Sequence, residues 1–359
     1  MVNYLISAYS VNPYKGSEDS IGWNWVLQYE KNYKEGDRII LLTKKFNEKD
    51  TRRGLKEFNI QHVELVIVDV PNALNWFREK HSAFHHMYYI LWQHWAWLWV
   101  KHSGIHFDVI HHVTMNDYRI PSELYKAKGA KVIWGPMGGA QVTPRPLKVY
   151  EKNQLVASFR EFVNKSCSWN PFYKKALRSY YKIYCINNET QKQISRIVGK
   201  DVPLMPELAL RDEYKNLPIR KGNNDILKIV FVGRLIGKNV KLMGNRPLNQ
   251  IAEAYQQADV FVLPSLRETS GNVLLEAMAY AVPIVAFDTS FCRLLKEVDC
   301  GVFVNTDQAL EGIKEDWCKA IVTLGQDKEL AKQMGLNGYK YVNSKLTWDE
   351  KYRIIVNDM

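Results

Sequence analysis

Two glutamates stand eight positions apart around a short polar stretch. Residues 258–279 read Ala-Asp-Val-Phe-Val-Leu-Pro-Ser-Leu-Arg-Glu-Thr-Ser-Gly-Asn-Val-Leu-Leu-Glu-Ala-Met-Ala, so Glu268 falls in a loop and Glu276 in the helix expected after it. Because helical side chains lean toward the N-terminus of their helix, Glu276 can point back at a ligand held in the loop. One carboxylate can then hold sugar hydroxyls while the other holds a ribose.

The residues between the two glutamates suit a phosphate group. Thr269, Ser270 and Gly271 offer hydroxyls and backbone N–H groups without bulk, and the helix is expected to begin near Gly271 or Asn272. Ligands of open parallel α/β sheets bind beyond the carboxyl ends of strands, and a helix N-terminus there favours an anion. The stretch therefore predicts a site for a phosphorylated ligand.

The elements that must position these residues form two series of strands alternating with helices. The first series has apolar segments at 5–9, 38–43, 63–68, 108–113, 131–134 and 181–186, and the second at 227–232, 259–263 and 283–286. Such alternation is typical of parallel sheets wrapped by helices. We expect an α/β protein with two Rossmann-like lobes, residues 1–205 and 206–345, and a C-terminal helix at 346–359 long enough to cross back to the first lobe.

The second lobe is expected to be shortened. Residues 240–243 look like the next strand after Val232, yet parallel neighbours need a crossover of about a dozen residues. Either the two strands pair differently, or a helix–strand–helix segment is missing near Lys238 and Asn239. The second interpretation is favoured.

The pair of glutamates, with its strand, loop and helix, resembles the E-x7-E signature of the retaining GT-B-fold glycosyltransferases (glycosyl transferases group 1, family 4 type). Residues 231–235 look like the Gly-Arg-Leu turn of that family, in which the arginine, here Arg234, reaches the donor pyrophosphate. Lys238 stands close to the usual position of a second cation. Residues 16–25 resemble the first loop of members from bacterial polysaccharide synthesis, where Gly16 would let the backbone approach phosphate or acceptor.

Two further strand ends extend the resemblance. The loop at 134–139 contains Gly138 and Gly139, which either leave room for the acceptor or a phosphate, or form a plain turn. At the end of the strand at 108–113, the family commonly has a histidine that contacts the transferred sugar. This chain has His111 and His112 side by side where the family has His-x-His. Because neighbours on a strand face opposite ways, only one of them can face the donor, and the sequence does not choose between them.

The resemblance implies a mechanism without a metal or a cofactor beyond the nucleotide-diphosphate sugar. Arg234, Lys238 and a helix N-terminus would neutralise the diphosphate. The sequence has no Asp-x-Asp pair at a strand end and no His or Cys cluster at metal-ligand spacing. The acceptor would attack from the face that the diphosphate leaves, which retains configuration, and the leaving phosphate would serve as base.

Charge and aromatic residues predict an anionic partner. The net charge is +11, and residues 145–182 carry nine Lys or Arg against two acids, interleaved with aromatic side chains. Anionic lipid, a pyrophosphate-linked acceptor and nucleic acid would each suit this segment, and a solvated basic face is the plain alternative. The Trp-rich segment 83–102 is expected to be a core helix or an interfacial membrane helix.

These features predict a cytoplasmic protein, peripheral on the inner face of the cell membrane. The five cysteines are scattered, and the start of the chain lacks the pattern of a signal peptide. The expected acceptor is a lipid-linked oligosaccharide or polysaccharide. A catalytically weak partner subunit and a nucleic-acid-binding module are the alternatives, although no recognised nucleic-acid-binding motif is present. The donor sugar, its base and the oligomeric state stay open.

Overall fold

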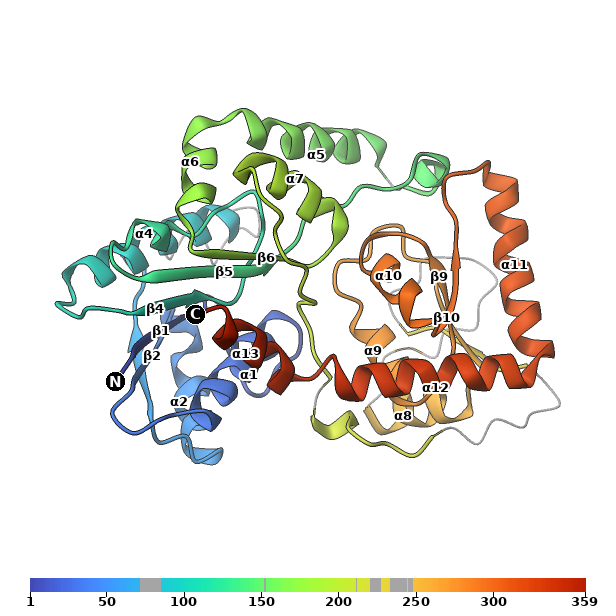
Figure 1. Cartoon of the computed structure of the whole chain (residues 1–359), viewed down its shortest axis with the longest axis horizontal. Coiled ribbons are helices and arrows are strands. Elements are labelled where there is room, and N and C mark those ends of the chain that lie inside the picture. Colours follow the sequence, from blue (N-terminus) through green and yellow to red (C-terminus); the bar gives the residue numbers. More distant parts are fainter. Residues whose placement is uncertain (72–84, 152, 211, 220–226, 233–243, 245–247) are drawn as a thin grey trace. The chain divides into compact units, whose positions relative to one another are not determined.

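The computed structural model describes residues 1–71, 85–151, 153–210, 212–219, 227–232, 244 and 248–359. They divide into two compact units: Met1–Ala140, Glu161–Glu207 and Lys351–Met359 form the first, and Gln141–Arg160 and Leu208–Glu350 the second. Both are built on parallel sheets with helices packed against them (Figure 1), so the predicted α/β class is confirmed. The structure assigns residues 141–160 to the second unit, whereas the sequence-based division leaves them in the first.

The described part of the first unit contains a six-stranded sheet in the order β3-β2-β1-β4-β5-β6. The strands are β1 (Asn3–Ser7), β2 (Arg38–Thr43), β3 (Val63–Ile67), β4 (Val109–His112), β5 (Lys131–Met137) and β6 (Lys182–Cys185). Five of the six residues of β2 are buried, as expected for a strand covered on both faces. The strand order reverses between β1 and β4, and the crevice beyond this point is where such sheets bind ligands.

The helices of the first unit pack against this sheet. They are α1 (Glu18–Lys31), α2 (Glu48–Glu57), α4 (His85–His102), α6 (Pro171–Ser179) and α7 (Asn188–Val198), joined by most of α13 (Trp348–Asn357) and the end of α5 (Gln154–Ser166). Helix α13 lies beside α1 (Figure 1), where the rings of Tyr29 and Tyr352 meet edge to face with their centroids 5.3 Å apart.

Helix α4 belongs to the core of the first unit. Tyr88, Tyr89, Trp92 and Ala96 are buried in one hydrophobic cluster with residues of the sheet, and the Trp92 indole N–H donates to the carbonyl of Val68 at 2.9 Å. The Trp-rich pattern at 83–102 therefore follows the core-helix alternative over the described part of that segment. No helix in the described ranges is long and apolar enough to cross a bilayer.

The described part of the second unit contains a four-stranded parallel sheet in the order β10-β9-β8-β7. Its strands are β7 (Ile229–Val230), β8 (Val260–Leu263), β9 (Ile284–Phe287) and β10 (Gly301–Val304), and its helices are α8 (Leu248–Gln257), α9 (Asn272–Ala279), α10 (Ser290–Leu295), α11 (Leu310–Gln326) and α12 (Lys328–Ser344). A core of Val260, Val285 and Val304 packs against α11. The strand expected at 240–243 and the suspected break near Lys238 and Asn239 lie outside the described residues.

Candidate active site

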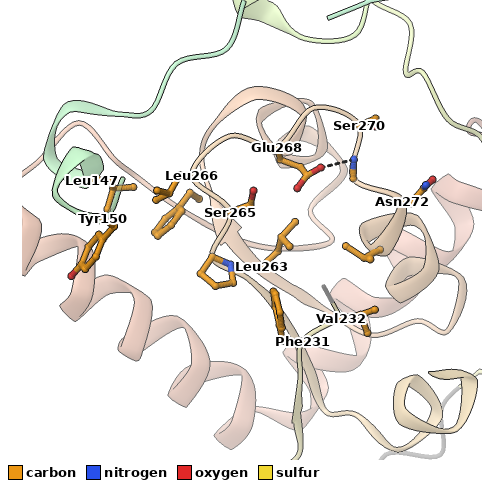
Figure 2. A pocket seen from close by; sticks show the side chains of 14 residues that line it. Leu147, Tyr150, Phe231, Val232, Leu263, Ser265, Leu266, Glu268, Ser270 and Asn272 are labelled. Carbon is orange, nitrogen blue, oxygen red and sulfur yellow. Dashed lines mark hydrogen bonds between the residues drawn. The ribbon is translucent and has the colours of Figure 1, made fainter. Parts of the chain in front are cut away.

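A pocket of about 680 Å³ opens at the carboxyl ends of the second sheet. Its floor is formed by the residues that end or follow β7, β8 and β9, among them Phe231, Leu263 and Phe287. One side carries Glu268 and the start of α9, as Figure 2 shows. A pocket of this size accommodates a ligand of several hundred daltons. The position is the one that parallel α/β sheets use for ligands.

The loop between β8 and α9 is closed by Glu268. Its Oε1 accepts a hydrogen bond from the backbone N–H of Gly271 at 2.9 Å, drawn as a dashed line in Figure 2. The pocket is lined here by Ser270, Gly271 and Asn272. Helix α9 begins at Asn272, and Gly271 is its N-cap residue. The first amides of a helix are without intrahelical partners and carry partial positive charge. This end of the pocket is therefore suited to a diphosphate.

Gly271 is required by the backbone at this turn. Its φ is +59°, a conformation that favours glycine, and an added Cβ would lie 2.6 Å from Cδ1 of Leu274. The glycine thus allows the chain to turn from the loop directly into α9.

The other residues of the predicted motif have different surroundings. Thr269 accepts a hydrogen bond at Oγ1 from the Gln141 amide at 2.6 Å. Glu276 lies inside α9, where the Tyr255 hydroxyl donates to its Oε2 at 3.2 Å. The pocket lining includes Glu268, Ser270, Gly271 and Asn272, and neither Thr269 nor Glu276 is among the described residues that form it.

In the first unit, the predicted glycine loops lie at the carboxyl end of the sheet. Gly16 is exposed in the loop after β1, with open space where a Cβ would stand. Glu18, two residues later and the first residue of α1, accepts at Oε2 from the N–H of Met115 at 3.1 Å, which joins the start of α1 to the loop after β4. Burial raises the pKa of the Glu18 carboxyl. Sequence analysis did not single out Glu18, although an acidic residue at the start of the first expected helix was the available signal.

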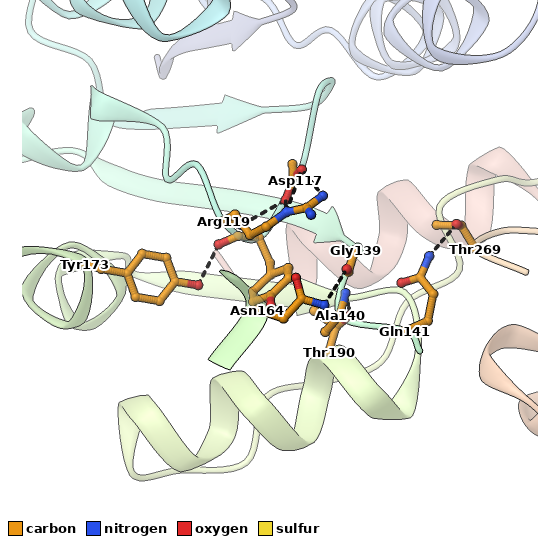
Figure 3. A network of polar contacts seen from close by, with 10 residues as sticks. Asp117, Arg119, Gly139, Ala140, Gln141, Asn164, Tyr173, Thr190 and Thr269 are labelled. Atoms are coloured by element: carbon orange, nitrogen blue, oxygen red, sulfur yellow. Dashed lines mark hydrogen bonds and ion pairs between the residues drawn. The ribbon is translucent and has the colours of Figure 1, made fainter. Parts of the chain in front are cut away.

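The loop after β5 is joined to the loop after β4. The N–H of Gly138 donates to the carbonyl of Asn116 at 3.1 Å, and the carbonyl of Gly138 accepts from Tyr118 at 3.0 Å. Gly139 has a φ of +114°, and its carbonyl accepts from the Asn164 amide at 3.4 Å (Figure 3). These contacts make the glycine pair part of an ordered turn at the edge of the switch-point crevice.

Both histidines at the end of β4 are buried and hydrogen-bonded within the first unit. His111 shares a hydrogen bond of 3.2 Å with the Tyr29 hydroxyl, and His112 is 2.9 Å from the hydroxyls of both Ser7 and Tyr89. Burial lowers the pKa of each imidazole to about 3. The rings are therefore neutral hydrogen-bonding partners at pH 7, and in this structure both are covered by protein.

The predicted phosphate-binding cations Arg234 and Lys238 lie outside the described residues. Across the ranges that are described, no group of three or more His, Cys, Asp or Glu side chains could hold a metal ion.

Sequence analysis missed one wall of the pocket. Residues 141–151, here called the strap, follow β5 in the chain but pack in the second unit, and their 3-10 helix Arg145–Tyr150 brings Leu147 and Tyr150 to the pocket. No local signal in 141–151 predicts this position, because the contacts that hold the segment join it to residues far away in the chain.

Comparison with known proteins agrees with this architecture. Residues 220–327 match the model of the family Glycosyl transferases group 1. D-inositol 3-phosphate glycosyltransferase from Corynebacterium efficiens is 25% identical over 138 residues, which are 38% of this chain and 28% of that protein. The chain thus spans little more than a quarter of the length of this relative.

Solved structures resemble the whole chain at low sequence identity. WaaG, a glycosyltransferase involved in lipopolysaccharide biosynthesis, has a TM-score of 0.56 at 14% identity, covering 98% of this chain and 99% of its own. Anabaena HepE, solved in complex with UDP and glucose, has a TM-score of 0.53 at 12% identity over 100% of both chains. The chain therefore shares the fold of these glycosyltransferases, and residues 220–327 match the glycosyl transferases group 1 model.

Proposed function

We propose that this protein is a retaining, metal-independent glycosyltransferase that uses a nucleotide-diphosphate sugar in the synthesis of a cell-surface glycan. The observation that carries the proposal is the pocket at the carboxyl ends of β7, β8 and β9, with Glu268 closing the loop at the start of α9. The group 1 domain and the UDP-bound neighbour HepE support a sugar nucleotide as the ligand.

In the proposed reaction, the diphosphate lies at the N-terminus of α9, where Ser270 offers a hydroxyl and Asn272 offers a side-chain amide and a backbone N–H. The bond from the anomeric carbon to the diphosphate breaks, and the electron pair leaves with the phosphate oxygen. The acceptor hydroxyl attacks the oxocarbenium-like carbon from the same face and gives its proton to the departing phosphate. The protein accelerates this step by positioning and by electrostatic stabilisation of the departing anion.

The first unit would hold the acceptor. The loops that contain Gly16, Gly138 and Gly139 lie at the switch point of the first sheet, the usual ligand position in such a fold. In this proposal the neutral rings of His111 and His112 stabilise the end of β4 through their hydrogen bonds. The end of the strand contacts the transferred sugar through its main chain.

A lipid-linked acceptor and an anionic membrane surface fit one exposed part of the molecule. In the first unit, Phe162 near the end of α5 is 57% exposed. Trp169 contacts Phe162 with a centroid distance of 6.2 Å and is also exposed. Lys165 and Lys175 are exposed in the same stretch. Aromatic side chains beside lysines favour the interface of anionic lipid.

Vesicle flotation tests the membrane proposal. The intact protein should float with vesicles containing phosphatidylglycerol and much less with pure phosphatidylcholine. Replacing Phe162 and Trp169 together by serine should reduce flotation at least about tenfold, since two aromatic side chains buried in the lipid interface contribute several kcal/mol. Phe46→Ser, at an exposed phenylalanine outside this stretch, is the matched control. Equal flotation of the double variant and the control would reject the membrane surface.

A donor screen tests the activity itself. The purified protein is incubated with UDP-, GDP- and TDP-sugars, and binding and slow hydrolysis are both recorded. One donor should bind and be hydrolysed, Arg234→Ala should abolish donor binding, and Glu268→Ala should lower the rate of hydrolysis by roughly 10²–10³-fold. A folded protein that binds none of these donors would rule the transferase proposal out and leave the partner-subunit alternative.

A further inference from the structure

The strap is fixed to the second unit at both of its ends. At its start, the Gln141 amide donates to Thr269 Oγ1 at 2.6 Å, as Figure 3 shows. At its end, Glu151 lies 3.7 Å from the guanidinium of Arg267 and accepts from the hydroxyl of Thr143. Both anchors in the second unit, Arg267 and Thr269, flank Glu268 in the loop after β8. The strap and the loop at the pocket are thus joined on both sides of the proposed catalytic carboxylate.

The middle of the strap is fixed by packing. Leu147 is only 2% exposed and belongs to the hydrophobic core with Val285 and Phe287, at the end of β9. A buried leucine side chain of this kind contributes about 1.5–3 kcal/mol of transfer free energy. The position of the strap beside the pocket therefore follows from core packing as well as from polar contacts.

This anchoring leaves the ring of Tyr150 at the pocket. Tyr150 lines the cavity and is 56% exposed, on the same side as Leu147 and Leu266, as Figure 2 shows. The side chains of Ser270 and Asn272 lie at the other side of the pocket. The pocket thus has the Tyr150 ring on one side and the start of α9 on the other.

We propose that Tyr150 is the stacking platform for the nucleobase of the donor, so the strap supplies the base end of the site and α9 the phosphate end. This inference rests on the proposed function. A sugar nucleotide has a flat base at one end, which suits the Tyr150 ring, and a diphosphate toward the other, which suits the start of α9. Every base has a π-face, so stacking on one tyrosine holds bases without choosing among them. Tyr150 therefore contributes affinity, and base selection belongs to other contacts.

Calorimetric titration of the full-length protein tests this role, with UDP, GDP and inorganic pyrophosphate as probes. Tyr150→Ala should weaken the nucleotide that binds by roughly 5- to 150-fold, the range for loss of one base–aromatic stack. Pyrophosphate, which has no base, should bind as before. Tyr150→Phe should stay within about threefold of the unchanged protein, because stacking does not use the hydroxyl. Val149→Ala, at an exposed neighbour on the strap outside the pocket, is the matched control.

The outcomes separate this inference from the proposed function. If the unchanged, folded protein binds neither UDP nor GDP, the donor proposal fails whatever Tyr150 does. If a nucleotide binds and Tyr150→Ala leaves its affinity unchanged, or weakens nucleotide and pyrophosphate equally, the stacking role is overturned. Loss of nucleotide affinity in Val149→Ala as well would show that the strap was displaced, and would also overturn the specific role of the ring.

Discussion

At the scale of single residues, the location of Glu268 and its hydrogen bond to the backbone distinguish it from Glu276. Its carboxylate lies in the pocket lining and accepts from the first amide of the turn into α9. Glu276, the other half of the predicted pair, accepts from Tyr255 instead. The two carboxylates of the motif thus have separate surroundings, and we expect substitutions at them to have different effects.

We predict that Glu268→Ala lowers turnover by roughly 10²–10³-fold, the usual cost of losing one preorganised electrostatic group in an active site. Release of nucleoside diphosphate measures this. Glu253→Ala on α8, an exposed glutamate outside the pocket lining, should leave turnover unchanged. A Glu268→Ala protein that retains the turnover of the control would remove Glu268 from the proposed site.

Gly271 provides a second residue-scale prediction, in stability. Gly271→Ala should lower the free energy of unfolding by about 1–3 kcal/mol, because alanine is strained at a positive φ and its Cβ would meet Leu274. Urea denaturation measures the change. Gly16→Ala is the matched control, since its Cβ would enter open space, and it should be nearly neutral. Equal urea midpoints for the two variants would show that the turn into α9 accommodates alanine without loss of stability.

At the scale of elements, β4 ends in two buried imidazoles whose pKa is lowered to about 3, mainly by burial. In the unfolded chain the same groups titrate near 6.5. Between these values the unfolded state binds more protons than the folded state, so stability is complete above about pH 6.5 and falls as the pH is lowered toward 3.

The expected loss on going from pH 7 to pH 5 is roughly 2 kcal/mol per histidine. Urea denaturation at several pH values measures it. His112→Gln should reduce the change in the free energy of unfolding with pH. His86→Gln, at an exposed position on α4, should leave this pH dependence unchanged. A stability that does not change between pH 7 and pH 5 would contradict the burial of these neutral rings.

Most strands of the two sheets were predictable from short apolar runs, whereas β10 was not among the predicted strands. Residues 38–43 and 260–263 were placed correctly within one or two positions, since strands buried on both faces have an unambiguous composition. The pattern of α4 favoured a core helix but also fitted an interfacial membrane helix, because tryptophan suits either environment. The burial of Tyr89 and Trp92, and the hydrogen bond from Trp92 to Val68, distinguish the two.

The strap could not have been predicted from its own residues. Its contacts with Arg267 and Thr269 join positions more than a hundred residues apart, and no local pattern encodes such a pairing. The loop around Glu268 was accessible to sequence analysis because strand, loop and helix follow one another within residues 258–279. The wall opposite that loop comes from elsewhere in the chain.

At the scale of the whole molecule, the end of the chain completes the first unit. Ile355 is fully buried, the Asp358 carboxylate lies 2.9 Å from the ammonium of Lys182, and Tyr184 also donates to it. We predict that a chain ending at Glu350 loses about 2–5 kcal/mol of stability, the usual cost of removing one large buried aliphatic side chain.

Differential scanning calorimetry of the shortened chain measures this loss. Asp358→Asn, which keeps the helix and its buried face but removes the charge from the pair with Lys182, should cost much less than the deletion. An unchanged melting temperature after removal of residues 351–359 would show that α13 adds nothing to the first unit.

The division of the chain into Met1–Ala140, Gln141–Arg160, Glu161–Glu207, Leu208–Glu350 and Lys351–Met359 also limits how the protein can be exchanged or dissected. A fragment that starts at Leu208 would lack Leu147 and leave the apolar surface of Val285 and Phe287 uncovered. Recombination with a related gene at one point between Arg160 and Leu208 would likewise exchange the pocket residues of Leu208–Glu350 while keeping the original strap. The segment Leu208–Glu350 is therefore not a transferable module by itself, because the second unit stays intact only when Gln141–Arg160 is kept with it.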